Sequence, residues 1–240
     1  MKNRSEQLIL ELGKKIVFGV CTPGEILPKV EDLSEEYNVS RTVIREAYKG
    51  LSTLGLVRSN QRSGTVVLPR TEWQWWNLEV MTWLLEDPNN KDFLLHLTEV
   101  RMGLEPTAAA LAASRATEQD RMNIEEAFQK LEQSIGDEKA WAKADYDFHE
   151  SILKASHNDL LIGTIRIMRK ALTVSREKTL PLTNDNQEFP YDSPTRAAIE
   201  KHRMIYEAIM SRDEAMANKK MTELILRVRT ILQKIFNNYS

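Results

Sequence analysis

Two arginines lie one helical turn apart in the stretch VSRTVIREAYKGLSTLGLV, residues 39–57. Arg41 and Arg45 share a face near the start of a helix that the apolar spacing predicts. A guanidinium group can donate two hydrogen bonds to O6 and N7 of guanine, and a helix N-terminus attracts phosphate. The pattern therefore favours a DNA-binding surface, and the alternative is an ordinary solvated basic face.

A second polar group lies within apolar segments of the C-terminal part. Asp145 and His149, four residues apart, share a predicted helix face with Trp141 and Phe148, and His202 lies in another apolar segment. A carboxylate and two imidazoles inside a helical bundle need partners, and a divalent metal would supply them. Three interpretations stay open: a metal completed by water or effector oxygen, a metal-free pocket that binds an effector directly, and polar residues without a ligand role.

Two further arginines point toward the same interior. Arg101 lies on the apolar side of its predicted helix with Leu104, where an unpaired guanidinium is costly. An internal ion pair with Glu99 or Glu105 is one explanation. Arg176 lies on an apolar face of a later helix and is a weaker candidate.

The elements around Arg41 and Arg45 follow a definite order. An apolar series from Leu8 to Val17 predicts a first helix, and residues 31–37 a second. Ser40 suits the N-cap of the third helix, which should end at Gly55. The segments LVRS and TVVL around NQRSG then predict a β-hairpin. This is the order of a winged helix-turn-helix.

The remainder of the chain has helical periodicity. We predict helices over 78–86, 91–115, 118–135, 138–156, 158–178, 194–211 and 213–236, with one long loop in residues 180–194. The expected fold is mainly α: a winged helix-turn-helix over 1–68, an aromatic linker over 69–77, and an all-helical effector-binding and dimerisation domain over 78–240. Trp73, Trp75 and Trp76 in the linker should pack against both domains, with stacking on nucleic-acid bases as the alternative.

Composition and charge agree with this division. The 240 residues are 42% hydrophobic and 28% charged, with a net charge of -2. Residues 1–70 contain 11 Lys/Arg and 8 Asp/Glu, whereas the remainder contains 22 and 27, so a small basic module precedes a larger acidic one. No signal peptide or membrane span is evident, and the single Cys21 excludes an internal disulfide, so we expect a cytoplasmic protein.

The stretch PGEILPKVEDLSEEYNVSRTVIREAYKGLSTLGLVRSNQRSGTVV resembles the N-terminal domain of the GntR family of bacterial transcription regulators over nearly all of residues 5–68. The resemblance implies that Arg41, Thr42 and Arg45 contact bases and phosphates. One departure is Glu31, because many members carry arginine there, so operator preference should differ. The full set of candidate DNA contacts is Ser40, Arg41, Thr42, Arg45, Lys49, Gln61, Arg62 and Gly64, the last three at the wing.

The segments TEVRMGLEPTAAALAASRAT and ADYDFHESILKASHNDLL resemble the FCD ligand-binding domain of the FadR subfamily, over about residues 95–230. The resemblance implies that Arg101 binds an effector carboxylate and that an Asp and three His hold a divalent metal such as Zn, Ni or Mn. Asp145, His149 and His202 match three of these ligands. The fourth position is Leu224, which cannot coordinate a metal.

These observations predict a homodimeric, DNA-binding transcriptional regulator, acting as a repressor. A small carboxylate effector should release the operator DNA, and the resemblance favours a sugar acid such as an aldonate or hexuronate over another organic acid. Effector contacts are expected from Arg101, Asp145, His149, His202 and Arg176. A metal-dependent enzyme is disfavoured, because no nucleophile, glycine-rich phosphate loop or HExxH motif accompanies the polar group. The acidic bulk disfavours a non-specific architectural DNA protein.

Overall fold

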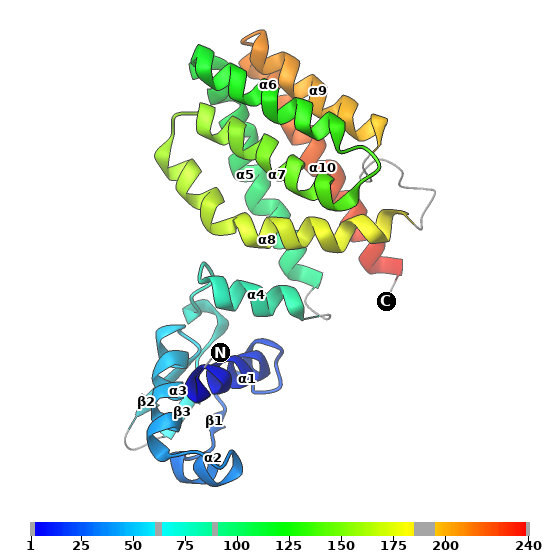
Figure 1. The fold of residues 1–240 in the computed structure, drawn as a ribbon. Coiled ribbons are helices and arrows are strands. Elements are labelled where there is room, and N and C mark those ends of the chain that lie inside the picture. Colours follow the sequence, from blue (N-terminus) through cyan, green and yellow to red (C-terminus); the bar gives the residue numbers. More distant parts are fainter. Residues whose placement is uncertain (1–2, 61–63, 88–90, 185–194, 239–240) are drawn as a thin grey trace. The chain divides into compact units, whose positions relative to one another are not determined.

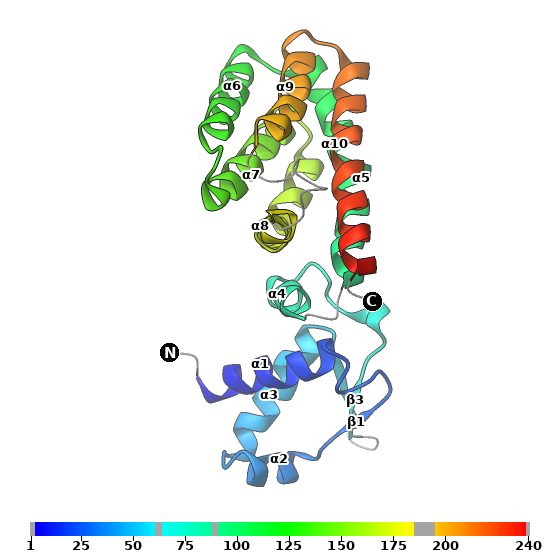
Figure 2. The ribbon, with the colours of Figure 1, turned by 90° about the vertical axis from the view of Figure 1, so that its right-hand side faces the viewer.

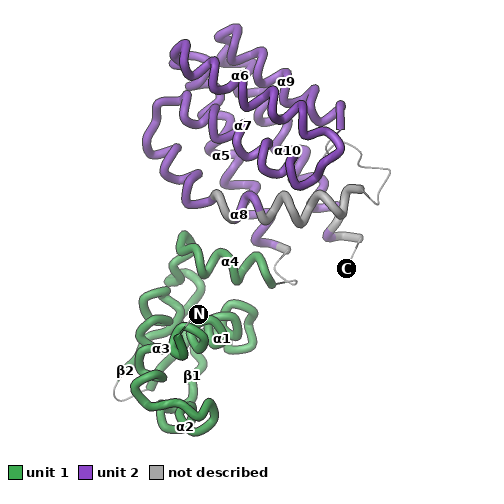
Figure 3. Tube along the Cα trace, in the orientation of Figure 1, with its two compact units in different colours: residues 1–90 green, residues 91–240 purple. Residues whose placement is uncertain are grey.

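The computed structural model describes residues 3–60, 64–87, 91–184 and 195–238. The chain divides into two compact units, residues 1–90 and residues 91–240 (Figure 3). Gln61 and Arg62 of the candidate wing lie outside the described residues, as does the side chain of Arg176. No helix in the described ranges is both long and apolar enough to cross a membrane.

Unit 1 contains the predicted winged helix-turn-helix. Its elements are α1 (Arg4–Val17), β1 (Ile26–Leu27), α2 (Val30–Glu36), α3 (Arg41–Thr53), β2 (Val57–Asn60) and β3 (Gly64–Val67). The three strands form an antiparallel sheet in the order β1, β3, β2. Strand β1 was not predicted; Ile26 pairs with Val66 across the sheet.

Helix α3 divides its residues between the core and the surface. Ser40 caps its N-terminus by accepting a hydrogen bond from the backbone N–H of Val43. Ile44, Ala47 and Leu51 are fully buried. The helix is followed by Gly55, whose φ is +70°, and an added Cβ would lie 2.4 Å from the carbonyl oxygen of residue 72. Only glycine therefore fits this turn without displacing the backbone that follows the sheet.

The aromatic linker folds back on unit 1. A short 3-10 helix, η1 (Arg70–Glu72), precedes Trp73, which is buried and donates its indole N–H to the carbonyl of Leu68. Trp75 stacks on Trp73 with ring centroids 5.8 Å apart, and the Arg70 guanidinium lies over both rings. Trp76 is half exposed. The contacts of Trp73 and Trp75 are thus made with neighbouring residues of the same unit.

Helix α4 (Leu78–Glu86) belongs to unit 1, although we expected residues 78–86 in the helical domain. Trp83 is 3% exposed and lies against Gly13 of α1, where a Cβ would be 2.4 Å from the indole. Lys14 and Glu86 form a 2.6 Å ion pair beside it. Gly13 lets the two helices approach closely enough to bury the indole, which accounts for the position of α4.

Unit 2 is an all-helical bundle, as predicted. Its helices are α5 (Lys91–Arg115), α6 (Glu118–Gln133), α7 (Glu138–Ala155), α8 (Asp159–Asn184), α9 (Arg196–Met210) and α10 (Glu214–Asn238). Helices α5 and α10 run side by side over much of their length (Figures 1 and 2). Helix α8 continues to residue 184, beyond the predicted end at 178, and so includes Pro181. Residues 185–194 of the expected loop lie outside the described residues.

The contact between α1 and α4 can be tested with Gly13→Ala. The new methyl carbon would overlap a buried indole that has no free space to enter, so we expect a net loss of about 1–2 kcal/mol in the free energy of unfolding of unit 1. This cost exceeds the gain of up to about 1 kcal/mol that alanine brings to a helix interior. Urea unfolding followed by circular dichroism measures the change.

Gly103→Ala is the matched control. Gly103 is exposed within α5, and an added Cβ there would meet no atom within 4 Å. It should gain up to about 1 kcal/mol from helix propensity alone. If both variants are stabilised equally, the Trp83 contact is not tightly packed.

Candidate functional site

The exposed face of α3 presents the candidate DNA contacts. Arg41, Thr42, Arg45 and Lys49 are all exposed on this helix, because the buried positions between them are apolar. Ser40 is exposed and uses its hydroxyl oxygen as the N-cap. These positions are those that a recognition helix needs for entry into a major groove, where its N-terminal residues contact the base edges.

A concave surface of about 1320 Å³ lies beside this face, between α3, the start of α2 and the hairpin. Its cationic lining residues are Lys29, Arg45, Lys49 and Arg58. Gly64 also lines it, with a φ of +80° at the beginning of β3. The concavity has the charge required to hold a nucleic-acid backbone.

One acidic residue lies in this cationic setting. The carboxylate of Glu31, on α2, is 3.6 Å from a guanidinium nitrogen of Arg41 and also lines the concavity. A second pair joins Arg58 of β2 to Glu72 of η1 at 2.5 Å. Arg41 is therefore held by an acid on the preceding helix, whereas no ion pair is formed by Arg45 within the described residues.

The candidate effector site in unit 2 is a buried chain of polar side chains. On α5, the Arg101 guanidinium donates to Glu105 through Nε at 2.6 Å and through Nη2 at 3.3 Å. Oε2 of Glu105, which also accepts from Nη2 of Arg101, lies 2.7 Å from Nδ1 of His149, on α7. Arg101, Glu105 and His149 are all at most 7% exposed. Glu105 thus links the expected carboxylate-binding arginine to an expected metal ligand.

The chain continues across α7 to α9. Nε2 of His149 lies 3.8 Å from Oδ1 of Asp145, and the same oxygen lies 3.0 Å from Nε2 of His202. Nδ1 of His202 is 2.8 Å from the carbonyl oxygen of Ala198. Asp145, His149 and His202 each offer a ligand atom, and these atoms lie within 4.8 Å of one another. The structure therefore brings together the three residues that the sequence singled out.

The neighbours of the imidazoles determine where their protons lie. The carbonyl oxygen of Ala198 accepts from Nδ1 of His202 in the tautomer that leaves Nε2 unprotonated, and Nδ1 of His149 lies beside the Glu105 carboxylate, although neither ring nitrogen of His149 makes a hydrogen bond of good geometry. In those tautomers the Nε2 lone pairs of His149 and His202 would face the Asp145 carboxylate, which is itself an acceptor, so a bound cation would be needed to make the arrangement favourable. Three electron-pair donors converge, which is the arrangement that a divalent cation satisfies.

The electrostatics favour a neutral His149 and an ionised Glu105. Burial lowers the pKa of His149, and the nearby carboxylates of Glu105 and Asp145 only partly oppose this effect. Burial alone would raise the pKa of Glu105, but the Arg101 guanidinium and the His149 imidazole hold it well below its usual range. A neutral imidazole is the form that binds a metal.

Two residues of unit 2, Leu224 and Glu105, show what the sequence did not predict about this site. Leu224, at the expected fourth ligand position, is buried in the apolar core of unit 2. The sequence suggested Glu105 as a partner of Arg101 but not of His149, since the only local signal is its four-residue spacing from Arg101. Glu99, the other suggested partner, pairs with Arg229 of α10 at 3.1 Å.

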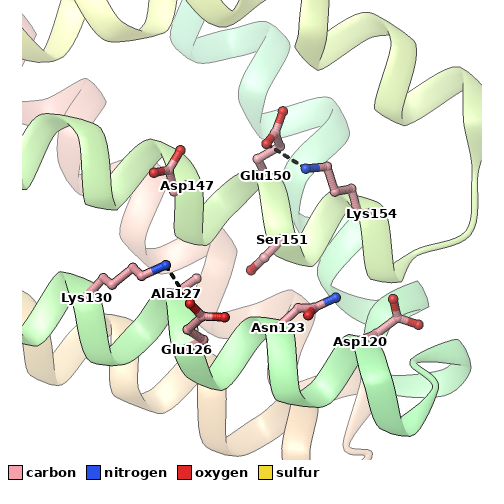
Figure 4. A pocket seen from close by; sticks show the side chains of 9 residues that line it. All are labelled: Asp120, Asn123, Glu126, Ala127, Lys130, Asp147, Glu150, Ser151 and Lys154. Atoms are coloured by element: carbon pink, nitrogen blue, oxygen red, sulfur yellow. Dashed lines mark hydrogen bonds and ion pairs between the residues drawn. The ribbon is translucent and has the colours of Figure 1, made fainter.

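A second, smaller groove of about 270 Å³ lies between α6 and α7 (Figure 4). Four of its charged side chains form two ion pairs, Glu126 with Lys130 and Glu150 with Lys154. Asp120 at one end pairs with His157. These exposed pairs are typical of a solvated surface, so we assign this groove no ligand.

Comparisons with known proteins match both units. Residues 4–67 match the model of bacterial regulatory proteins of the gntR family, and residues 96–227 match the FCD domain. The chain is 29% identical over 233 residues to the galactonate operon transcriptional repressor of Escherichia coli (strain K12), covering 97% of this chain and 98% of that protein. It is 30% identical over 227 residues to the HTH-type transcriptional regulator YieP of the same organism, covering 93% of each.

A solved structure of Lar, which controls the expression of the Listeria monocytogenes agr system, has a TM-score of 0.62 to this chain. The sequence identity is 19%, and the match covers 98% of each chain. At this identity the likeness concerns the fold alone.

The buried imidazole makes stability depend on pH. The unfolded chain binds a proton at His149 near pH 6.5, whereas the lowered pKa keeps the folded imidazole neutral, so the metal-free protein loses stability as pH falls below 6.5. The contribution is at most about 1.4 kcal/mol per pH unit. Urea unfolding at pH 7.5, 6.5 and 5.5 with a chelator measures this slope, and His149→Asn should reduce it.

His96→Asn serves as the control, because His96 is an exposed histidine of α5 in the same unit. This variant should keep the slope of the unchanged protein. A slope that is the same in all three proteins would contradict a buried neutral His149.

Proposed function

The chain belongs to the GntR family of bacterial regulatory proteins and carries an FCD domain, and from this premise we propose a homodimeric repressor that a small carboxylate effector releases from its operator. Membership makes the protein a transcription regulator and not an enzyme. The observation that supports the proposal is that one chain contains both an exposed, arginine-bearing α3 surface in unit 1 and a buried Arg101–Glu105–His149 chain in unit 2. Such a regulator acts in the cytoplasm.

In the proposed DNA complex, α3 enters the major groove and Arg45 binds a guanine edge. Lys49 and Thr42 lie on the same exposed surface and contact phosphates, and Gln61, Arg62 and Gly64 of the wing reach the flanking backbone or minor groove. One winged helix-turn-helix covers one half-site, so a homodimer places two recognition helices about one DNA turn apart.

The proposed effector is a sugar acid, an aldonate or a hexuronate. A relative with 29% identity is the galactonate operon transcriptional repressor, and Arg101 offers the planar fork that binds a carboxylate in bidentate fashion. Glu105 already occupies that fork, so an incoming carboxylate has to share or replace an internal one. Arg176 remains a proposed second contact. Another organic acid is the alternative, because a carboxylate alone does not specify the rest of the molecule.

A divalent metal such as Zn, Ni or Mn fits the donors that converge between α7 and α9. Asp145, His149 and His202 would hold it, and the carbonyl of Ala198 and the carboxylate of Glu105 would keep the two imidazoles in the ligating tautomer. When bound, the ion supplies a Lewis-acid position that binds an effector oxygen. Leu224 provides no fourth ligand, so coordination by three protein residues leaves that position to water or effector.

The proposed switch is a coupling between the two units. An effector that binds one arrangement of the dimer better than the other lowers operator affinity, and the operator must then weaken effector binding by the same factor. This reciprocity provides a measurement of the switch that needs no assumption about the path of the coupling.

Arg45→Ala tests the DNA surface. Loss of a bidentate contact to guanine should weaken binding to the preferred DNA about 10- to 100-fold, equivalent to about 1–3 kcal/mol, and relax the preference at one base pair. Fluorescence anisotropy with DNA enriched from a random library measures both effects. Lys49→Ala is the matched control: a lost phosphate contact should weaken all sequences alike and reduce the salt dependence by about one counterion. Unchanged affinity in Arg45→Ala would refute the assignment of α3.

Thermal shift with galactonate, glucuronate and lactate tests the effector class. A sugar acid at a hundred times its Kd should stabilise the protein by about 2.7 kcal/mol and reduce its affinity for the enriched DNA. Arg101→Lys keeps the charge but loses the fork, so it should lose the shift while keeping DNA binding. The same thermal shift, measured on metal-stripped protein with and without added zinc, distinguishes a pocket that binds the effector through a metal from one that binds it directly. If every acid binds without changing DNA affinity, the proposed switch is wrong.

A further inference from the structure

Glu31 is an acidic residue on a surface whose other charged residues are cationic. The described concavity beside α3 is lined by four cationic residues, Lys29, Arg45, Lys49 and Arg58, and Glu31 is its one acidic lining residue there. A carboxylate at this position repels phosphate, which a protein that only needs affinity for DNA would avoid. The position of Glu31 therefore calls for a function other than general attraction to DNA.

Folding does not account for this residue. The side chains of Glu31 and Arg41 are 47% and 63% exposed, and ion pairs so open to water contribute little to stability. An acid in the first turn of α2 favours the helix dipole, but Asp32 in the same turn provides that effect as well. The stability of the fold therefore does not explain why this position carries a glutamate.

The ion pair with Arg41 indicates a role in the recognition of bases. A carboxylate of Glu31 lies 3.6 Å from a guanidinium nitrogen of Arg41, so an acceptor and a donor stand side by side at the beginning of α3. In the major groove, a C·G base pair presents the N4 amine of cytosine next to the O6 and N7 acceptors of guanine. N4 and O6 are hydrogen-bonded to each other, about 3 Å apart. The two side-chain atoms are 3.6 Å apart, close enough for the acceptor and the donor to face these neighbouring base atoms.

We propose that Glu31 is a specificity-determining residue, and that Glu31 and Arg41 together recognise one C·G base pair. Glu31 accepts a hydrogen bond from cytosine N4, while Arg41 donates to guanine. Adenine also carries an amine, but its N7 acceptor lies beside it and repels a carboxylate, so cytosine is preferred. This inference rests on the proposed function, in which α3 lies in the major groove.

Selection from a random duplex library, followed by sequencing, tests the proposal with the full-length protein, Glu31→Gln, Arg41→Ala and Asp32→Asn. The unchanged protein should select a C·G pair at a fixed position in each half-site. Glu31→Gln should reduce the preference for that pair about tenfold and leave the other positions of the motif intact. Arg41→Ala should affect the same pair, and the double variant should lose little more than either single one.

Asp32→Asn is the matched control. Asp32 is an exposed acid in the same turn of α2, and its substitution by Asn removes one negative charge, as Glu31→Gln does. It should keep the C·G preference. An unchanged motif in Glu31→Gln, an effect at a different base pair from that of Arg41→Ala, or an equal effect in Asp32→Asn would overturn the proposal.

Two other outcomes are equally decisive. Stronger binding of Glu31→Gln to all sequences, with the motif unchanged, would show that Glu31 only repels phosphate. If the unchanged protein selects no motif, the proposed function itself fails, and this result is distinct from the loss of one position in a motif that is otherwise retained.

Discussion

A charged group inside a helical bundle is tolerated only when its partners are built into the same bundle. In unit 2 this constraint falls on Glu105, which is 1% exposed and ionised. Its two partners come from different elements: Arg101 from the preceding turn of α5 and His149 from α7. Removing Arg101 would leave the buried Glu105 charge unbalanced, and removing His149 would leave one oxygen of that carboxylate without a close polar contact from α7, so the relative position of α5 and α7 is tied to the chemistry of the pocket. Packing and the proposed ligand binding in this unit therefore depend on the same contacts.

Unit 1 meets the opposite constraint, because its function requires charges to stay outside. Helix α3 buries Ile44, Ala47 and Leu51 and exposes Arg41 and Arg45, so a single amphipathic pattern supplies both the core and the DNA-facing surface. The N-cap at Ser40 determines where the helix begins, and therefore which residues occupy its first exposed turn. The fold and the proposed function of this helix are thus encoded by the same periodicity.

The difference between these two cases explains how much the sequence could predict. Local periodicity identified α3 and the helices of unit 2, and it placed Asp145 and His149 on one buried face. It could not identify β1, because two residues are too few to show alternation and Ile26 remains exposed. It also assigned α4 to the wrong unit, since the contact between Trp83 and Gly13 joins residues far apart in the sequence.

The contact between Glu105 and His149 was not predicted either, because it also joins residues far apart in the sequence. Within the described residues, Asp145, His149 and His202 bring three ligand atoms within 4.8 Å of one another without a fourth protein ligand. Leu224 instead belongs to the apolar core of unit 2. If Asp145, His149 and His202 hold a metal, an effector oxygen that completed its coordination would link the two binding equilibria. The effector would then raise metal affinity by the same factor by which the metal raises effector affinity.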